Sequence, residues 1–386
     1  MNGSTIKYTL KSLRTLSTVR PQQIISIAPM LDVTTRYQRY VMRKITKHAT
    51  LYTEMVVDST LFYQAGYKRD RLLKFDPCEH PVVFQFGGNN PQVLSDLAVH
   101  VQKEGYDEID INCGCPSPKV AKGSFGVTLM LYPQIVAQIV KEIKSKVTVP
   151  VTVKCRLGVD SCNKYEDLCN FISKVHDTGC HHFIVHCRHC YLDGGNAKYN
   201  RRVPQLNYLW IYRLLDDFPT VNFTINGDIN SLEKAKELLD TTSPKGRYLS
   251  GAMIGRLAMN DPYALHTVDS MFYNDNTPIP CRAQIIKDYI LYIQQLTQNP
   301  SFTSPSISIL SRPIINLFKG IPNGSIYKQT LQGCFYVKKM PLYDSLCMAL
   351  RSIPPSILYN MDENTYNKEK IQEYCDFFKL NYEPFY

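Results

Sequence analysis

Eight short apolar segments recur along the first two thirds of this chain, and they constrain its fold more than any other feature. Each segment is rich in β-branched residues and apolar on both faces, as expected for parallel strands that are covered on both sides. The predicted strands are Ile24–Pro29, Leu51–Glu54, Val82–Phe86, Glu108–Asn112, Val151–Cys155, Phe183–His186, Val221–Asn226 and Leu249–Ile254.

Amphipathic segments lie between these strands, and the clearest are Pro91–Glu104, Tyr132–Lys144, Tyr165–Thr178 and Ser231–Leu239. Regular alternation of strand and helix indicates βα units. Eight such units over about 240 residues predict an α/β fold of the (β/α)8 TIM barrel type. A doubly wound open sheet is the alternative, because the sequence does not reveal whether the first strand pairs with the last.

The chain has 386 residues, more than one barrel needs, and both of its ends differ in character from the middle. We predict a basic N-terminal extension over 1–22, the barrel over 23–265, a small all-helical domain over 266–335 and a C-terminal extension over 336–386. The helical domain is predicted from Arg282–Thr297, Ser311–Phe318 and Ser325–Leu331. The remainder is rich in Tyr and Pro without a regular period, and we expect it to pack on the surface or to be partly disordered.

The first 31 residues contain no Asp or Glu but carry Lys7, Lys11, Arg14 and Arg20 among Ser and Thr. This pattern is typical of a transit peptide, and a frayed polar extension fits it equally well. We therefore expect a cytoplasmic or mitochondrial protein. The net charge of +10 favours polyanionic partners such as nucleic acid.

The 13 cysteines show no regular spacing, which predicts reduced thiols in an intracellular compartment. Cys113-Gly-Cys115 and Cys187-Arg-His-Cys190 each resemble half of a zinc site, but the sequence has no matching second pair, so we expect no metal. No apolar run approaches the about 18 residues that a membrane helix needs, and we expect no membrane partner.

Polar residues follow most of the predicted strands, at the end where barrel enzymes carry their chemistry. In chain order the strand ends are Ala28-Pro29-Met30, Glu54-Met55, Gln85, Asp110-Ile-Asn112, Lys154-Cys-Arg156, His186-Cys-Arg188, Asn226-Gly227-Asp228 and Gly255-Arg256, and all but the first contain a polar or ionisable residue. Lys154 should point inward, where an ammonium needs an anion or an ion-pair partner. His186 at the same depth is either a site residue or a hydrogen-bonded core histidine.

Gly227, Gly255 and Arg256 follow the last two strands, where they fit either a phosphate cradle or ordinary turns. Cys115 lies in a turn between Gly114 and Pro116, so its thiol is expected to face the mouth. A thiol with an ordinary pKa of about 8.5 is protonated at neutral pH and can serve as a general acid. The nucleophile alternative is weaker, because no His stands in a cysteine-protease signature.

Seven ordered motifs resemble those of the tRNA dihydrouridine synthases. They are Ala28-Pro29-Met30, Gln85-Phe-Gly-Gly88, Asp110-Ile-Asn-Cys-Gly-Cys-Pro-Ser117, Val153-Lys-Cys-Arg156, His186-Cys-Arg188, Asn226-Gly-Asp228 and Gly255-Arg256. The segments 119–126 and 317–324 are similar to the DusA-like branch, which reduces uridines near position 20 of the D-loop. The resemblance covers about residues 23–332.

The resemblance implies an FMN-dependent barrel with a tRNA-binding helical domain, in which hydride reaches uracil C6 and a cysteine protonates C5. Cys115 is then the acid, and Asn112 contacts the uracil. The implied cofactor-binding residues are Ala28, Pro29, Met30, Gln85, Lys154 and His186 around the flavin ring, and Asn226, Gly227, Asp228, Gly255 and Arg256 around the ribityl chain and phosphate. The implied tRNA-contacting residues are Lys198, Asn200, Arg201 and Arg312. We expect NADPH or NADH as the reductant and a monomeric protein.

The sequence departs from the family pattern at three places, one of which is the segment past about residue 335, where we recognise no family counterpart. Residues 191–197 lack the Ser-Pro that is usual before the loop lysine, and the segment after Gly324 is poorer in arginine. Two other functions stay open. A small-molecule FMN reductase, similar to dihydroorotate dehydrogenases, is disfavoured by the basic helical domain. A non-catalytic RNA-binding protein is disfavoured because Cys115, Lys154 and His186 occur together.

Overall fold

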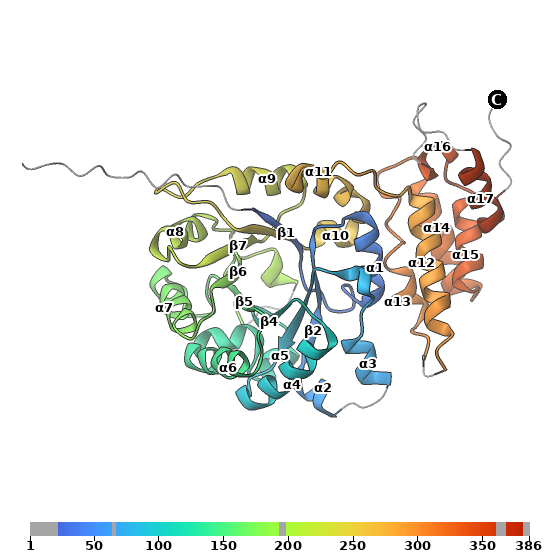
Figure 1. The fold of residues 1–386 in the computed structure, drawn as a ribbon. Coiled ribbons are helices and arrows are strands. Elements are labelled where there is room, and N and C mark those ends of the chain that lie inside the picture. Colours follow the sequence, from blue (N-terminus) through green and yellow to red (C-terminus); the bar gives the residue numbers. More distant parts are fainter. Residues whose placement is uncertain (1–21, 64–66, 193–197, 301, 360–367, 381–386) are drawn as a thin grey trace, which may run out of the picture.

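The computed structural model describes residues 22–63, 67–192, 198–300, 302–359 and 368–380. Eight parallel strands form a closed barrel in sequence order, with β1 paired to both β2 and β8 (Figure 1). The strands are β1 (Ile24–Ile27), β2 (Thr50–Val57), β3 (Val82–Gly87), β4 (Glu108–Cys113), β5 (Val151–Arg156), β6 (His182–His186), β7 (Asn222–Asn226) and β8 (Gly251–Ile254). The predicted barrel is confirmed, and the alternative of an open sheet is wrong because β1 and β8 pair.

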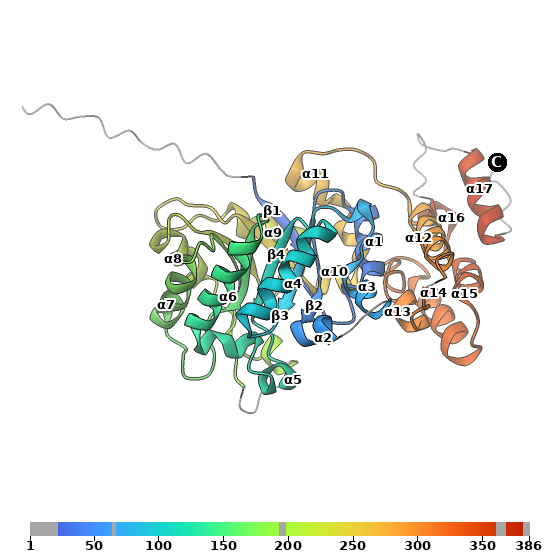
Figure 2. The same cartoon turned by 60° about the horizontal axis from the view of Figure 1, so that its bottom comes forward.

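Helices follow the strands, and the longer ones cover the outside of the barrel (Figures 1 and 2). They are α1 (Arg36–Ile45), α2 (Asp58–Tyr63), α3 (Tyr67–Leu73), α4 (Pro91–Glu104), α5 (Pro118–Lys122), α6 (Pro133–Lys146), α7 (Tyr165–His176), α8 (Leu209–Asp217), α9 (Leu232–Asp240), α10 (Arg256–Asn260) and α11 (Val268–Tyr273). Helix α4 has the predicted bounds, because residues that favour helix ends stand at both of its caps. The Asn90 side chain accepts from the Val93 N–H, and Gly105 adopts a φ of 98° after the last turn.

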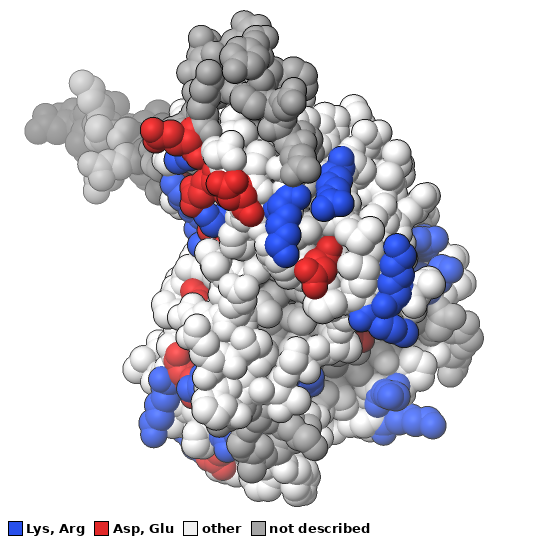
Figure 3. Space-filling model, turned by 90° about the vertical axis from the view of Figure 1, so that its right-hand side faces the viewer, with Lys and Arg blue, Asp and Glu red and all other residues white. Residues whose placement is uncertain are grey.

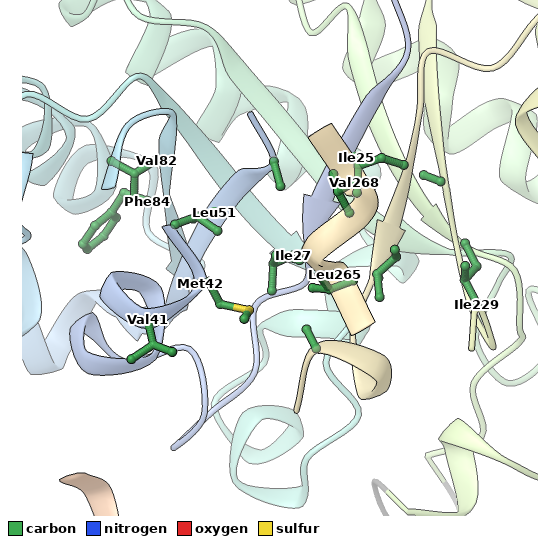
Figure 4. Packing of buried hydrophobic residues seen from close by; sticks show 14 of the residues in the cluster. Ile25, Ile27, Val41, Met42, Leu51, Val82, Phe84, Ile229, Leu265 and Val268 are labelled. Atoms are coloured by element: carbon green, nitrogen blue, oxygen red, sulfur yellow. The ribbon is translucent and has the colours of Figure 1, made fainter. Parts of the chain in front are cut away.

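An apolar layer between the strands and the helices stabilises the barrel. Figure 4 shows one part of it, where Ile25 and Ile27 of β1 lie near Met42 of α1 and near Leu265 and Val268. All five side chains are at most 2% exposed. Because parallel strands are apolar on their outer face, this layer fixes the strands and with them the loops at their carboxyl ends.

The remaining described helices form one helical unit beside the barrel (Figure 2). They are α12 (Arg282–Thr297), α13 (Ile307–Ser311), α14 (Gly324–Gln332), α15 (Leu342–Leu350), α16 (Pro355–Leu358) and α17 (Lys368–Phe378). Helix α12 has the predicted bounds, whereas the helix predicted over Ser311–Phe318 is wrong. Helix α13 ends at Ser311 and turns follow to Gly320. Pro313 explains the difference, because it has no N–H for a helical hydrogen bond and its ring collides with the preceding turn.

The helical unit includes residues past 335, where the sequence showed no period. Leu346 of α15 and Phe378 of α17 are fully buried, so these helices are built into the unit and are not an irregular tail. The unit joins the barrel through α12 and α1, where the rings of Tyr40 and Tyr292 stack at 4.0 Å and Arg36 Nε donates to the Tyr292 hydroxyl at 2.8 Å. The division of the chain into separate domains stays a prediction.

Residues 1–21 of the predicted N-terminal extension lie outside the described part of the chain. Within the described part, no helix combines the length and the apolar character that crossing a bilayer requires. Nor do three or more His, Cys, Asp or Glu side chains gather there in a way that could hold a metal ion.

Candidate active site

The register of the parallel strands brings the predicted site residues to one end of the barrel. Asn112 of β4 is the neighbour of Lys154 in β5, and His186 of β6 is the neighbour of Asn226 in β7. Gly255 directly follows β8, and a Cβ at this glycine would lie 3.5 Å from Ala28 Cβ and 3.7 Å from Met30 Sδ. The predicted residues of β1 and β8 are therefore close together.

Lys154 and Asn226 form a polar contact inside the barrel mouth. Lys154 Nζ donates to Asn226 Oδ1 at 3.1 Å, and Asn226 Nδ2 donates to the Met253 carbonyl at 2.8 Å. Burial lowers the pKa of Lys154, and the nearby Asp110 carboxyl opposes this. One amide oxygen is a weak partner for a buried ammonium, so the site suits a ligand with anionic or carbonyl oxygens.

His186 is half-buried, and its buried Nδ1 has no hydrogen-bond partner among the described residues. Burial, followed by the positive charges of Arg156 and Lys154, holds the pKa of His186 well below its ordinary value. The imidazole is therefore neutral at physiological pH, and it can donate to a ligand or accept from one. An unpartnered buried nitrogen at a barrel mouth marks a position where a ligand atom is expected.

Cys115 is held in its turn by Asn112. The backbone N–H groups of Gly114 and Cys115 donate to Asn112 Oδ1 at 3.2 and 2.9 Å, and Asn112 Nδ2 donates to Gln85 Oε1 at 2.9 Å. Burial raises the pKa of the Cys115 thiol, opposed by the Ser117 backbone N–H and then by Arg156. The thiol therefore stays protonated at neutral pH, as a general acid requires.

Two arginines meet at Asp228, after the last strands of the barrel. Arg188 Nη2 and Arg256 Nη2 each donate to one oxygen of the Asp228 carboxylate. Gly227 and Asp228 have φ values of 120° and 51°, a conformation that turns the backbone sharply. Arg188 Nε is also buried without a partner among the described residues. Two guanidinium groups of fixed position suit a phosphate, which binds arginine in a bidentate manner.

Arg188 and Arg156 are two site residues that the motifs contain but that the prediction did not single out. Arg156 Nε donates to the Gly114 carbonyl at 2.8 Å, and its Nη1 donates to the carbonyls of Asn200 and His189 at 2.9 and 3.2 Å. The guanidinium thus joins the Cys115 turn to the segment after β6. The sequence could have indicated both residues, because an arginine stands two positions after Lys154 and a second arginine stands two positions after His186.

Four residues were predicted to contact tRNA, and the structure places them differently from one another. Lys198 and Arg201 are exposed beside the barrel mouth. Arg312 Nη1 donates to the Asp32 carbonyl and so joins the helical unit to the loop after β1. Asn200, in contrast, is fully buried, and its amide bonds both the N–H and the carbonyl of Tyr191 at 2.8 Å. A direct RNA contact by Asn200 does not fit this position, because the side chain holds the loop from inside. Residues 193–197 of the same loop lie outside the described residues.

These features define a class of protein, a TIM barrel with a thiol, an ammonium, a neutral imidazole and an arginine pair at its mouth. The family model described as "Dihydrouridine synthase (Dus)" matches residues 26–352, and the chain belongs to this family. The match extends beyond the motifs into the helical unit, and because it reaches residue 352, the expectation that the family has no counterpart past about residue 335 is wrong for residues 336–352.

Three bacterial relatives with the name tRNA-dihydrouridine(20/20a) synthase are similar to most of the chain. The protein of Synechocystis sp. is 38% identical over 80% of this chain and 88% of its own length. The protein of Vibrio vulnificus is 39% identical over 79% and 89%, and that of Pasteurella multocida is 41% identical over 71% and 80%. The match to a solved structure of 2-naphthoyl-CoA reductase covers 64% of this chain and 50% of that protein, with 9% identity and a TM-score of 0.46.

Proposed function

We propose that this protein is a tRNA dihydrouridine synthase, which reduces the C5=C6 bond of a uridine in tRNA. The observation that carries the proposal is the Cys115 thiol, kept protonated by burial at the mouth of a barrel of the dihydrouridine synthase family. The relatives are named for positions 20 and 20a, and we propose the same region of the D-loop as the target.

The chemistry of the uracil ring explains why a protonated thiol is needed. The C4 carbonyl polarises the C5=C6 bond, so hydride addition at C6 places negative charge on C5 and O4. The Cys115 Sγ–H then gives its proton to C5, and the resulting thiolate regains a proton from solvent. Hydrogen-bond donors near O4, such as the Asn112 amide, stabilise the charge before the proton arrives. The target base must leave its stack to reach the barrel mouth.

FMN fits the unpaired and charged groups around this mouth. Arg188, Arg256 and the backbone beside Gly227 suit its phosphate, whereas His186 Nδ1 and Lys154 Nζ suit polar atoms of the flavin ring. When bound in its reduced form, FMN supplies the hydride, and we propose NADPH or NADH as the reductant that restores it. Among the predicted residues, Ala28, Pro29 and Met30 would lie along the ring.

We propose that the tRNA backbone lies across the barrel mouth and the helical unit. Lys198 and Arg201 are exposed at the mouth, and Arg312 lies where the two parts meet. Figure 3 views the helical unit, where Lys and Arg side chains follow the right-hand side of the view and acidic side chains gather at its upper left. Lysine and arginine attract phosphates regardless of base sequence, so this arrangement favours tRNA over a small substrate.

The test is the formation of dihydrouridine by the purified protein. With FMN, NADPH or NADH, and tRNA that lacks dihydrouridine, we expect the modified base in the D-loop, mapped by mass spectrometry of nuclease fragments. Cys115→Ala should keep FMN and tRNA affinity but lose most of the product. The matched control is Cys162→Ala, a half-buried cysteine in the loop after β5, which should keep full activity.

Each other outcome points to a different function. Protein that binds FMN and oxidises NADPH with a small pyrimidine but not with tRNA would be a small-molecule reductase. Protein that binds tRNA but cannot be loaded with FMN would be a non-catalytic binder. Full activity of Cys115→Ala would remove Cys115 as the acid.

A further inference from the structure

A chain of hydrogen-bonded side chains runs from the barrel interior to the Cys115 turn. Asp110 Oδ2 accepts from Gln85 Nε2 at 2.7 Å, and Gln85 Oε1 accepts from Asn112 Nδ2 at 2.9 Å. Asn112 Oδ1 then accepts from the backbone N–H groups of Gly114 and Cys115. Asp110 and Gln85 are fully buried, and Asn112 is 8% exposed. Cofactor or uracil binding does not explain the role of Asp110, because the side chains of Gln85 and Asn112 stand between its carboxyl and the Cys115 turn.

The direction of every hydrogen bond in this chain is fixed by its two ends. The N–H groups of Gly114 and Cys115 can only donate, so Asn112 must turn its oxygen toward them. Asn112 Nδ2 must then donate to Gln85, and Gln85 Nε2 must donate to the next group. That group is a carboxyl oxygen of Asp110, which accepts. Turning either amide around would set a donor against a donor, a costly arrangement in a buried site.

The acceptor at Asp110 does not depend on its protonation state. Its other oxygen, Oδ1, lies 3.1 Å from Thr152 Oγ1, which in turn donates to Glu108 Oε1 at 2.8 Å. A proton on Oδ1 would be donated to the threonine hydroxyl, and Oδ2 would still accept from Gln85. An amide at position 110 could offer Gln85 either an oxygen or an N–H group, so the orientation of the chain would then be fixed only at its other end, by the N–H groups of Gly114 and Cys115.

We propose that Asp110 is a positioning residue, whose carboxyl orients Gln85 and Asn112 so that Asn112 holds the Cys115 turn and offers an N–H to the uracil. Only one hydrogen of Asn112 Nδ2 goes to Gln85, and the orientation leaves the second one for a carbonyl oxygen of the base. This role rests on the proposed function, in which Cys115 is the acid. Asp110 touches neither the base nor the thiol. It acts on the Cys115 turn through the two amides, and its carboxyl separately favours the charged form of Lys154.

The test compares Asp110→Ala and Asp110→Asn with a matched control, Glu108→Gln. The control also removes a carboxyl of β4, a half-buried one, but its amide oxygen can still accept from Thr152 and no amide chain leads from it to Cys115. The first measurement is hydrogen–deuterium exchange at the Gly114 and Cys115 amides. We expect exchange about tenfold faster in Asp110→Ala and about threefold faster in Asp110→Asn, with no change in Glu108→Gln.

The second measurement is tRNA reduction under steady-state conditions. In Asp110→Ala we expect kcat to fall by about 10- to 100-fold while KM for tRNA stays within twofold, because the acid loses its alignment whereas the tRNA contacts remain. Asp110→Asn should recover part of this kcat. Slower proton delivery should also raise the solvent deuterium isotope effect on flavin oxidation, which we expect to be smallest in wild type, larger in Asp110→Asn and largest in Asp110→Ala.

Several results would overturn the proposal. One is equal exchange at Gly114 and Cys115 in wild type and Asp110→Asn, a variant of the same size that decides the question if Asp110→Ala does not fold. Another is an equal loss of kcat in Glu108→Gln, which would indicate a general effect of removing buried carboxyls. If the exchange order holds but no variant, wild type included, forms dihydrouridine, the positioning role stands and the proposed function fails.

Discussion

Arg156 joins the Cys115 turn to the segment after β6, and its replacement probes both stability and catalysis. The side chain is 3% exposed and donates to the carbonyls of Gly114, Asn200 and His189. Burial lowers the pKa of Arg156 to about 10, so the guanidinium keeps its charge at neutral pH. Arg156→Met keeps an unbranched apolar chain but leaves all three carbonyls without this donor.

The loss of stability follows from these three contacts. A hydrogen bond from a charged donor contributes about 1.5–3 kcal/mol. Adding this value for the three hydrogen bonds would overstate the loss of stability, because burying the guanidinium also costs desolvation energy. We expect the free energy of unfolding to fall by about 3–5 kcal/mol, the range for removing one side of a buried charged interaction. At about 2–4 °C per kcal/mol, Tm should fall by about 6–20 °C.

The assay is thermal unfolding followed by fluorescence, with dihydrouridine formation measured on the same preparations. The matched control is Lys236→Met, because Lys236 is exposed and pairs with Asp240 only at 3.7 Å. It should change stability by less than about 0.5 kcal/mol. In Arg156→Met, kcat should also fall by about 10- to 100-fold, because the Cys115 turn loses its second anchor. Values of Tm and kcat equal to those of Lys236→Met would refute the reasoning.

Three further predictions concern single groups. Because burial raises the pKa of Cys115, the single-turnover rate of uridine reduction should stay constant from pH 7 to about 8.5, whereas a fall by half near about 8.5 would indicate an ordinary thiol. Because His186 is held neutral, the Kd for FMN from flavin fluorescence should have the same pH dependence between about pH 8 and 6 in wild type and in His186→Phe, since only the cofactor phosphate, with a second pKa of about 6, titrates there; an additional transition centred at about 6.5 in wild type would contradict this. Glu79→Ala leaves Arg39 without the carboxylate that it bonds at 2.6 Å, so urea unfolding should show a loss of about 3–5 kcal/mol. Glu166→Ala at an exposed helix start should cost less than about 0.5 kcal/mol.

The regular parts of this fold were predictable from sequence because their causes are local. The strands follow from short β-branched runs, and α4 could be bounded at both ends because Asn90 and Gly105 are its caps. Where the cause is a single local residue that was not weighed, prediction went wrong, as at Pro313. Residues past 335 form helices through packing against α12 and α14, and such tertiary contacts leave no period in the sequence.

The partners of the polar residues could not be predicted in this way. Arg188 meets Asp228 across 40 residues, and Arg156 reaches Gly114 across 42. These pairs depend on which strands become neighbours in the barrel and on the register between them. Motifs indicate that an arginine belongs to the site, but only the folded barrel decides whether it faces a ligand or a backbone carbonyl.

The same distinction separates ligand-binding groups from supporting ones at this mouth. Asn200 and Arg156 form hydrogen bonds with backbone groups of the protein, so they hold loops in place. His186 Nδ1 and Arg188 Nε are buried without partners among the described residues. Leaving a buried nitrogen unpaired costs about 1–3 kcal/mol, a penalty that a bound cofactor removes. FMN should therefore raise the stability of the protein beyond the effect of its contact area, and the part of this gain due to His186 should disappear in His186→Phe, in which an apolar ring of similar shape carries no unpaired nitrogen.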